Sequence, residues 1–177
     1  MYAPPELMGP AGLTRASDLY SLGVVLRELL SGGFDYSSYS TTTVVDSLTK
    51  GQSPLRETDL SLPPWVCRGL RRIVSKATHP NPDFRYQTAR EMSTQIARVK
   101  TADWHEVSPS TWEAQHLRDA HVTIQVRAEP ISDGVRISTR KRKNVSWRRA
   151  AADATAASLD HPDVRAVFER ANNLAVN

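Results

Sequence analysis

Seven basic residues gather in one short part of the chain and could bind phosphate. The stretch between Gly134 and Ala152 has no acidic residue, and Trp147 lies among its cations. Cations beside an aromatic ring can bind phosphate and stack a nucleotide base, and such binding weakens as salt rises. A solvated strand end and turn explains the same charges and is the preferred interpretation. The basic residues are Arg136, Arg140, Lys141, Arg142, Lys143, Arg148 and Arg149.

Glu6 and Arg85 carry opposite charges, lie far apart in the sequence and each stand beside prolines. The planar guanidinium of arginine can bind a carboxylate through two parallel hydrogen bonds. Where such a pair is buried, removal of one partner costs about 3–5 kcal/mol, because the other charge stays unpaired. Two independent surface charges are the alternative. Asp18 stands where an apolar segment begins, and as a helix cap it would contribute about 1 kcal/mol.

The first hundred residues predict helices. Residues 18–31 are apolar around most of a helical circumference, which is typical of a buried helix. Ser17 or Asp18 is expected to cap it. Gly23 costs about 1 kcal/mol relative to alanine in mid-helix, so it indicates close packing. A surface loop is expected over 34–43, and further helices over 43–50, from Pro63–Pro64 and from Thr88.

The remaining residues predict a mixture of strands and helices. Ser110–Glu113 has capping-box spacing and predicts a short helix to about His121. Alternating apolar residues over 122–126 and 135–137 predict a β-hairpin. The Ala-rich segment 146–158 is expected to be helical, with Trp147 anchoring it against the hairpin. Residues 160–163 (DHPD) are expected to begin a last helix.

Composition narrows the class of protein. The chain has 177 residues, 40% of them hydrophobic, a net charge of +4 and one Cys. These values exclude a disulfide-stapled mini-protein and a chain disordered throughout. No apolar run approaches the roughly 20 residues of a membrane helix, and the first residues do not resemble a signal peptide. We therefore expect a cytoplasmic protein with no membrane partner, and its oligomeric state stays open.

Three segments resemble the C-terminal half of the eukaryotic-type protein kinase catalytic domain. Residues 2–6 (YAPPE) look like the Y-x-A-P-E that closes a kinase activation segment, with Pro4 for the usual Ala. Residues 17–26 (SDLYSLGVVL) are similar to the buried helix of the kinase lobe. Residues 81–85 (NPDFR) resemble the kinase DPxxR turn, with Asn81 for the usual Asp. The three motifs occur in kinase order, so the resemblance covers about residues 1–100.

The resemblance implies roles for three residues. Glu6 and Arg85 would form the buried ion pair that ties the activation segment to the helical lobe. Asp18 would accept hydrogen bonds from the backbone of the catalytic loop. That loop is not recognised in this sequence, so capping could be the only role left to Asp18.

Phosphoryl transfer needs a Gly-rich loop, a catalytic-loop Asp and Asn, and a metal-binding Asp. No G-x-G-x-x-G occurs. Residues 116–119 (HLRD) follow the lobe motifs, and residues 83–85 (DFR) lack the Gly of the metal motif. We therefore expect no catalytic, cofactor-binding or metal-binding residue here, with ATP and Mg²⁺ belonging to the intact family. The expectation is a truncated serine/threonine kinase domain, inactive alone; serine/threonine rather than tyrosine specificity rests on the style of the helix motif.

The expected fold is mainly α: the lower part of a kinase-like C-lobe over 1–100 and a small α+β tail with a β-hairpin over 101–177. The alternative function is a non-catalytic binding module. It would bind protein through residues 34–50 or, as the less favoured option, nucleic acid through the basic stretch 136–149. A third possibility is a chain with no independent function, because its buried helix lacks partners and an open apolar surface promotes aggregation.

Overall fold

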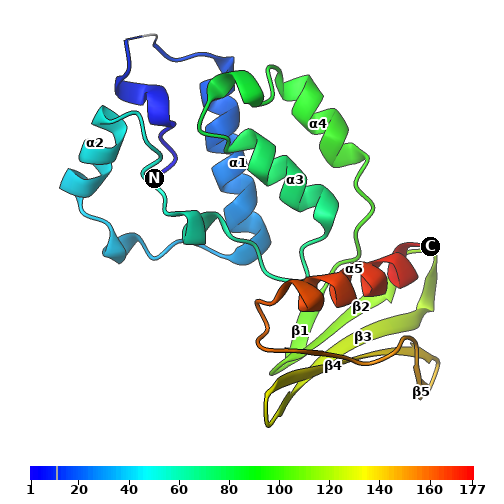
Figure 1. The fold of residues 1–177 in the computed structure, drawn as a ribbon. Coiled ribbons are helices and arrows are strands. Elements are labelled where there is room, and N and C mark those ends of the chain that lie inside the picture. The colour runs from blue at the N-terminus through cyan, green and yellow to red at the C-terminus, as the bar shows by residue number, and fades with distance from the viewer. Residues whose placement is uncertain (11) are drawn as a thin grey trace. The chain divides into compact units, whose positions relative to one another are not determined.

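The computed structural model describes residues 1–10 and 12–177, which form two compact units. Unit 1 comprises residues 1–63 and 69–99, and unit 2 comprises residues 64–68 and 100–177. Figure 1 shows unit 1 as helices and unit 2 as a sheet with one helix. None of the described helices has the length and apolar character needed to cross a membrane.

Unit 1 alternates helices with short 3₁₀ turns. The buried faces of α1, α3 and α4 meet around Leu19, Ile73 and Met92. A second apolar cluster joins Tyr20 and Val24 of α1 to the segments that follow it. In chain order the elements are η1 (Pro5–Met8), α1 (Arg15–Ser31), η2 (Tyr36–Ser38), α2 (Thr41–Thr49), η3 (Glu57–Leu60), α3 (Arg68–Ala77), η4 (Pro82–Phe84) and α4 (Ala89–Ala97).

The start of α1 differs from the prediction. Thr14 is the N-cap, and its backbone N–H donates to Oγ of Ser17 at 3.0 Å. Ser17 is therefore not the N-cap but the third helical residue, whose side chain completes the capping box, and Asp18 is an exposed residue of the first turn. An acid in the first turn still interacts favourably with the positive end of the helix dipole.

Gly23 lets α1 approach α3 closely, as the sequence indicates. A Cβ atom at Gly23 would lie 2.6 Å from Cβ of Ala77, a separation that real Cβ atoms do not show. The start of α3 is less well predicted. The helix expected from Pro63–Pro64 begins only at Arg68. Trp65 lies before it and packs against Trp112 within unit 2, with 5.4 Å between the ring centroids.

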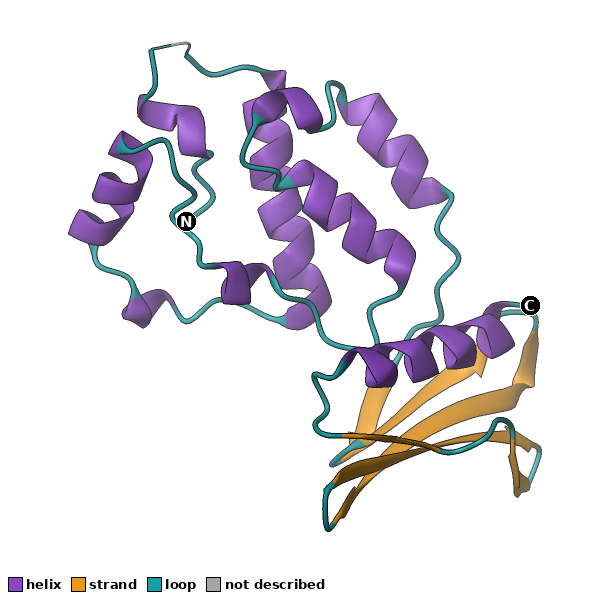
Figure 2. Ribbon diagram, viewed as in Figure 1, coloured by secondary structure: helices purple, strands orange, loops and turns teal. Residues whose placement is uncertain are grey.

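Unit 2 is an antiparallel sheet with one face covered by a helix (Figures 1 and 2). The strands pair in the order β1-β2-β3-β4-β5, and β6 also pairs with β4. Val126 and Ile137 from the sheet and Phe168 from the helix are buried together with Trp112. The elements are β1 (His105–Ser108), β2 (Thr111–His116), β3 (Asp119–Ile131), β4 (Gly134–Lys143), β5 (Ser146–Arg149), β6 (Ala154–Ala156) and α5 (Pro162–Val176).

The expectation of a mainly α protein is wrong. The described residues contain five α-helices together with a six-stranded antiparallel sheet that dominates unit 2. Ser110 has φ of 57° and turns the chain directly into β2, where Trp112 pairs with Val126. The Ala-rich segment forms β5 and β6 rather than a helix, because β4 offers both of them a backbone partner.

Two predictions for unit 2 are confirmed. The hairpin joins β3 to β4, with Ile131 paired to Gly134 across its turn. The last helix begins at Pro162, and His161 supplies its cap, with Nδ1 accepting from the N–H of Asp163 at 3.3 Å. The apolar face of α5 is buried and is formed by Val164, Val167, Phe168 and Ala171.

Candidate functional site

The Glu6–Arg85 ion pair is present and bidentate. Nη1 of Arg85 donates to Oε1 of Glu6 at 2.7 Å, and Nη2 donates to Oε2 at 2.8 Å. Local structure positions both residues, because Pro5 opens the turn η1 that carries Glu6 and Arg85 directly follows η4. The contact joins positions 79 residues apart in sequence. It therefore ties the first turn of unit 1 to the segment between α3 and α4.

Every N–H of the Arg85 guanidinium has an acceptor. Besides Glu6, Nε donates to the carbonyl of His79 at 2.6 Å, Nη2 to that of Pro80 at 2.8 Å and Nη1 to that of Ala16 at 3.3 Å. The Arg85 side chain is fully buried. A buried cation is tolerated only when it is paired and hydrogen-bonded throughout, so this set of acceptors is what makes the burial possible.

Two residues of α1 complete the site. Oγ of Ser17 donates to Oε1 of Glu6 at 2.7 Å, and the Arg85 guanidinium lies 4.9 Å from the centre of the Tyr20 ring. Burial acts to raise the pKa of Glu6, but hydrogen bonds from Arg85 and Ser17 outweigh it and hold the pKa below the ordinary value. Tyr20 is fully buried and shares a hydrogen bond with Ser53 at 2.8 Å, and burial raises the pKa of its phenol.

Sequence reasoning identified the pair but missed Ser17 and Tyr20 as parts of the site. Their spacing of three places them on one face of α1, and that spacing was the available signal. Asp18, the third predicted structural position, does not join them and lies exposed. The carbonyls of residues 79 and 80 carry no sequence signal, because any residue can supply them.

The beginning of the segment 34–50 is held to α1 by two aromatic residues, Phe34 and Tyr36. The Arg27 guanidinium lies 4.5 Å from the centre of the Phe34 ring. The hydroxyl of Tyr36 donates to Oε1 of Glu28 at 2.6 Å, and that of Tyr2 donates to Oε2 of the same carboxylate. Burial acts to raise the pKa of Glu28, and the two tyrosine hydrogen bonds lower it overall. The surface around Tyr36 is therefore fixed by side-chain bonds while staying open to solvent.

The described residues contain no group of three His, Cys, Asp or Glu able to hold a metal ion. His79 belongs to its turn, where Nδ1 accepts from the N–H of Asn81 at 3.1 Å. Asp83 is exposed in η4, and residues 116–119 span the end of β2, the two-residue turn at 117–118 and the start of β3.

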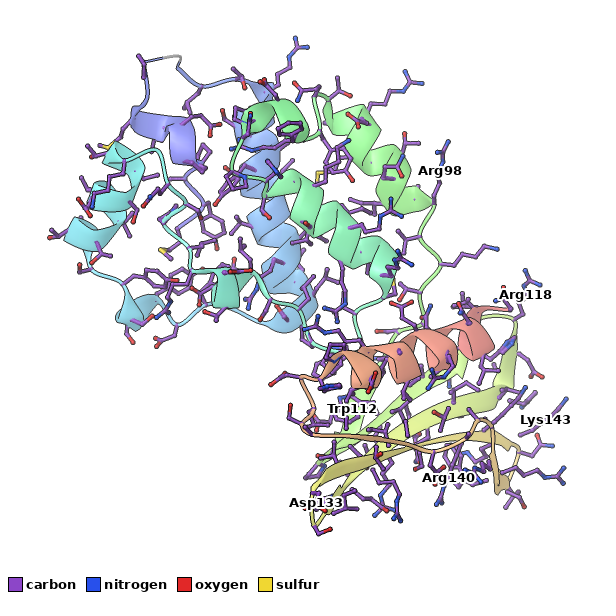
Figure 3. The ribbon with its side chains drawn as sticks, in the orientation of Figure 1. Arg98, Trp112, Arg118, Asp133, Arg140 and Lys143 are labelled. Atoms are coloured by element: carbon purple, nitrogen blue, oxygen red, sulfur yellow. The ribbon has the colours of Figure 1, made fainter. Side chains whose placement is uncertain are left out.

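The predicted basic residues lie on β4 and β5 of unit 2. Figure 3 shows Arg140 and Lys143 on the sheet, away from Trp112 beneath α5. Trp147 lies on β5 rather than on a helix, half-buried with the Arg142 guanidinium 4.7 Å from its ring centre. Its predicted role as an anchor for an Ala-rich helix is therefore wrong, because that helix is not formed.

Comparison with known proteins assigns the first unit. Residues 1–96 match the family described as Protein tyrosine and serine/threonine kinase. The chain is 31% identical over 124 residues to "Serine/threonine-protein kinase PrkC" of Bacillus subtilis, covering 70% of this chain and 17% of that protein. It is 27% identical over 115 residues to "CBL-interacting serine/threonine-protein kinase 17" of Arabidopsis thaliana, covering 63% and 23%. The chain thus spans less than a quarter of the length of either relative.

Proposed function

The chain belongs to the protein kinase family through residues 1–96, and from that premise we propose that it supplies the activation-segment anchor of a serine/threonine protein kinase and does not transfer phosphate by itself. The observation that supports this most is the Glu6–Arg85 pair, in which every N–H of the guanidinium has an acceptor. The pair occupies the motif positions that the family uses to fix its activation segment. The names of the relatives support serine/threonine rather than tyrosine specificity.

The proposal of inactivity rests on chemistry. Transfer of a γ-phosphate depends on groups that hold the nucleotide, its metal ions and the attacking hydroxyl in line. The 177 residues contain no Gly-rich loop and no catalytic loop, and neither motif can be replaced by a side chain of the anchor. That the chain is a truncated form belongs to the same proposal, and reading the codons upstream of Met1 tests that part separately.

The test is nucleotide binding by the full 177-residue chain. We expect the melting temperature to stay unchanged when Mg-ATP is added, because a ligand stabilises a protein only by binding its folded state. We also expect no transfer of labelled phosphate to a general acceptor such as casein. A Mg-ATP-dependent rise in melting temperature, or transfer abolished by a metal chelator, would overturn the inactivity.

A second proposal concerns protein docking over residues 34–50. Its support is a surface that is open and yet ordered: Tyr36 is 48% exposed and Val45 41% exposed, while bonds to Glu28 hold the segment in place. An ordered surface loses little entropy on binding. Titration of the isotope-labelled chain with casein should shift amide signals of 34–50 selectively, and Tyr36→Ala should abolish those shifts. Shifts spread over the whole chain, or none, would remove this proposal.

A further inference from the structure

The end of β4, the turn after it and β5 form a two-stranded ribbon, residues 140–149, that we call the basic ribbon. Its register places Arg140 opposite Arg149 and Lys141 opposite Arg148. Like charges directly opposite each other on neighbouring strands are destabilising. Two adjacent pairs of this kind are a cost to the fold.

Acidic residues of unit 2 neutralise only part of the ribbon. Nζ of Lys143 lies 3.6 Å from Oδ2 of Asp119, and Nη2 of Arg149 lies 3.3 Å from Oδ1 of Asp153. Within residues 1–10 and 12–177, no ion pair is found for Arg140, Lys141 or Arg148. The ribbon therefore keeps an excess of positive charge at the solvent surface.

A hollow of about 660 Å³ lies against the ribbon and has only basic charge on its walls. Lys141, Lys143, Arg148 and Arg149 line it, along with the turn and Leu174 of α5, and no carboxylate does. The volume falls within the range of ordinary ligand sites. A hollow of about 740 Å³ elsewhere in unit 2 differs, because Asp103 and Glu113 share its wall with cations. Of these two hollows, only the one beside the basic ribbon has a lining charge that favours an anion.

The opposite side of the ribbon offers a stacking surface. Arg142 pairs with Trp147, and its guanidinium lies over the indole ring at 4.7 Å from the centre. A guanidinium plane held in this way can stack on a nucleotide base, as aromatic rings do. Strand β5 is the last strand in the sheet order, so one chain passing along this edge could reach both sides of the ribbon.

We propose that the basic ribbon binds single-stranded nucleic acid, with phosphates in the basic hollow and a base stacked on Arg142. Phosphates would take the place of the missing carboxylates beside Lys141 and Arg148. Nucleic acid fits better than a membrane surface, because the ribbon joins its cations to a stacking pair and exposes Val145 as the sole apolar side chain of its turn. The proposal concerns unit 2 and is independent of the kinase anchor in unit 1.

The test is fluorescence anisotropy of a short labelled oligothymidylate titrated with the full chain. We expect binding at about 50 mM salt that weakens as salt rises, with a slope of roughly −0.7 for each phosphate contacted. The variant Lys141→Gln/Arg148→Gln should bind at least about tenfold more weakly and give a shallower salt slope. The matched control Arg118→Gln/Arg165→Gln removes two exposed cations of the same unit and should change affinity far less.

A second variant tests the stacking part. Arg142→Lys keeps the positive charge but loses the planar guanidinium, so it should weaken oligothymidylate binding while leaving nearly unchanged the binding of an abasic oligonucleotide, which has phosphates but no bases. Equal melting temperatures for all variants show that folding is intact. Four results overturn the proposal: no binding at low salt, equal losses in the two double variants, equally tight binding of inorganic phosphate, or tighter binding to vesicles containing phosphatidylserine.

Discussion

Arginines occur in two opposite settings in this molecule. In unit 1, Arg85 is buried and all its N–H groups are accepted by protein atoms. In unit 2, Arg140 and Arg148 lie exposed on the basic ribbon and face other cations. A guanidinium whose N–H groups are all bonded within the protein has no donor free for a ligand, so its role is to hold the fold. Exposed cations directly opposite each other tend to destabilise a sheet, so their role is sought in binding.

The two units can be monitored separately, which makes the comparison testable. All four tryptophans lie in unit 2 and all five tyrosines in unit 1. Tryptophan fluorescence therefore reports the unfolding of unit 2. Far-UV circular dichroism reports mainly on unit 1, which contains most of the helical residues of the described chain.

The largest expected effect is that of Arg85→Ala. The substitution leaves Glu6 without its counter-charge in a partly buried place, so the free energy of unfolding of unit 1 should fall by about 3–5 kcal/mol. Urea unfolding followed by circular dichroism measures it. Arg90→Ala, an exposed arginine on α4, is the matched control and should cost under about 0.5 kcal/mol. Equal costs for the two variants would show that the pair does not hold the lobe.

Glu6→Gln should have a smaller effect that depends on pH. The pKa of Glu6 is held below 4.5 in the folded state, so its contribution to stability is complete above that value. As pH falls through the folded-state pKa, protonation removes the contribution, and the stability gap between wild type and variant should close. Other carboxylates with lowered pKa, such as Glu91, cancel in this difference. A gap that stays constant down to acid pH would contradict the assigned shift.

Gly23→Ala should destabilise unit 1 by about 1–2 kcal/mol. The better helix propensity of alanine, about 1 kcal/mol, is outweighed by overpacking against Ala77. Gly33→Ala is the matched control, because a Cβ there would meet only Oε1 of Glu28 at 3.8 Å. Thermal unfolding compares the two. A Gly23→Ala protein as stable as wild type would mean that α1 and α3 do not pack as closely as described.

The smallest effect, of opposite sign, is expected on the basic ribbon. Lys141→Gln/Arg148→Gln removes a like-charged pair, so the unfolding free energy of unit 2 should stay the same or rise by about 0.5 kcal/mol. Urea unfolding followed by tryptophan fluorescence measures it. A clear loss of stability would place these cations with Arg85, as parts of the fold, and would remove the contrast between the two units.

Sequence patterns predicted the anchor better than the sheet, and for a physical reason. The order of the three motifs indicated the Glu6–Arg85 pair because each motif is a contiguous run of residue types. The spacing of Ser110–Glu113 predicts a helix around Trp112, because it is that of a capping box, whereas the chain there forms β2. Local spacing cannot show that Trp112 has a strand partner, Val126, on the far side of a turn.

The Ala-rich segment shows the same limit. Alanine favours helix in isolation, but residues 146–149 and 154–156 both pair with β4, and non-local pairing overrides local propensity. By contrast, α5 was predictable, because its cap, first-turn proline and apolar face agree with one another. In the anchor, Tyr20 was visible only as an apolar residue, and nothing in the sequence marks which ring will lie against a guanidinium.

The claim that the Glu6–Arg85 pair anchors unit 1 is tested most directly by a double-mutant cycle on these two residues. Unfolding free energies of unit 1 are measured for wild type, Glu6→Gln, Arg85→Ala and the double variant. We expect a coupling free energy of at least about 2 kcal/mol, with the double variant far less destabilised than the sum of the two single variants. A coupling below about 0.5 kcal/mol would contradict it, because the two residues would then act independently and the anchor would not exist.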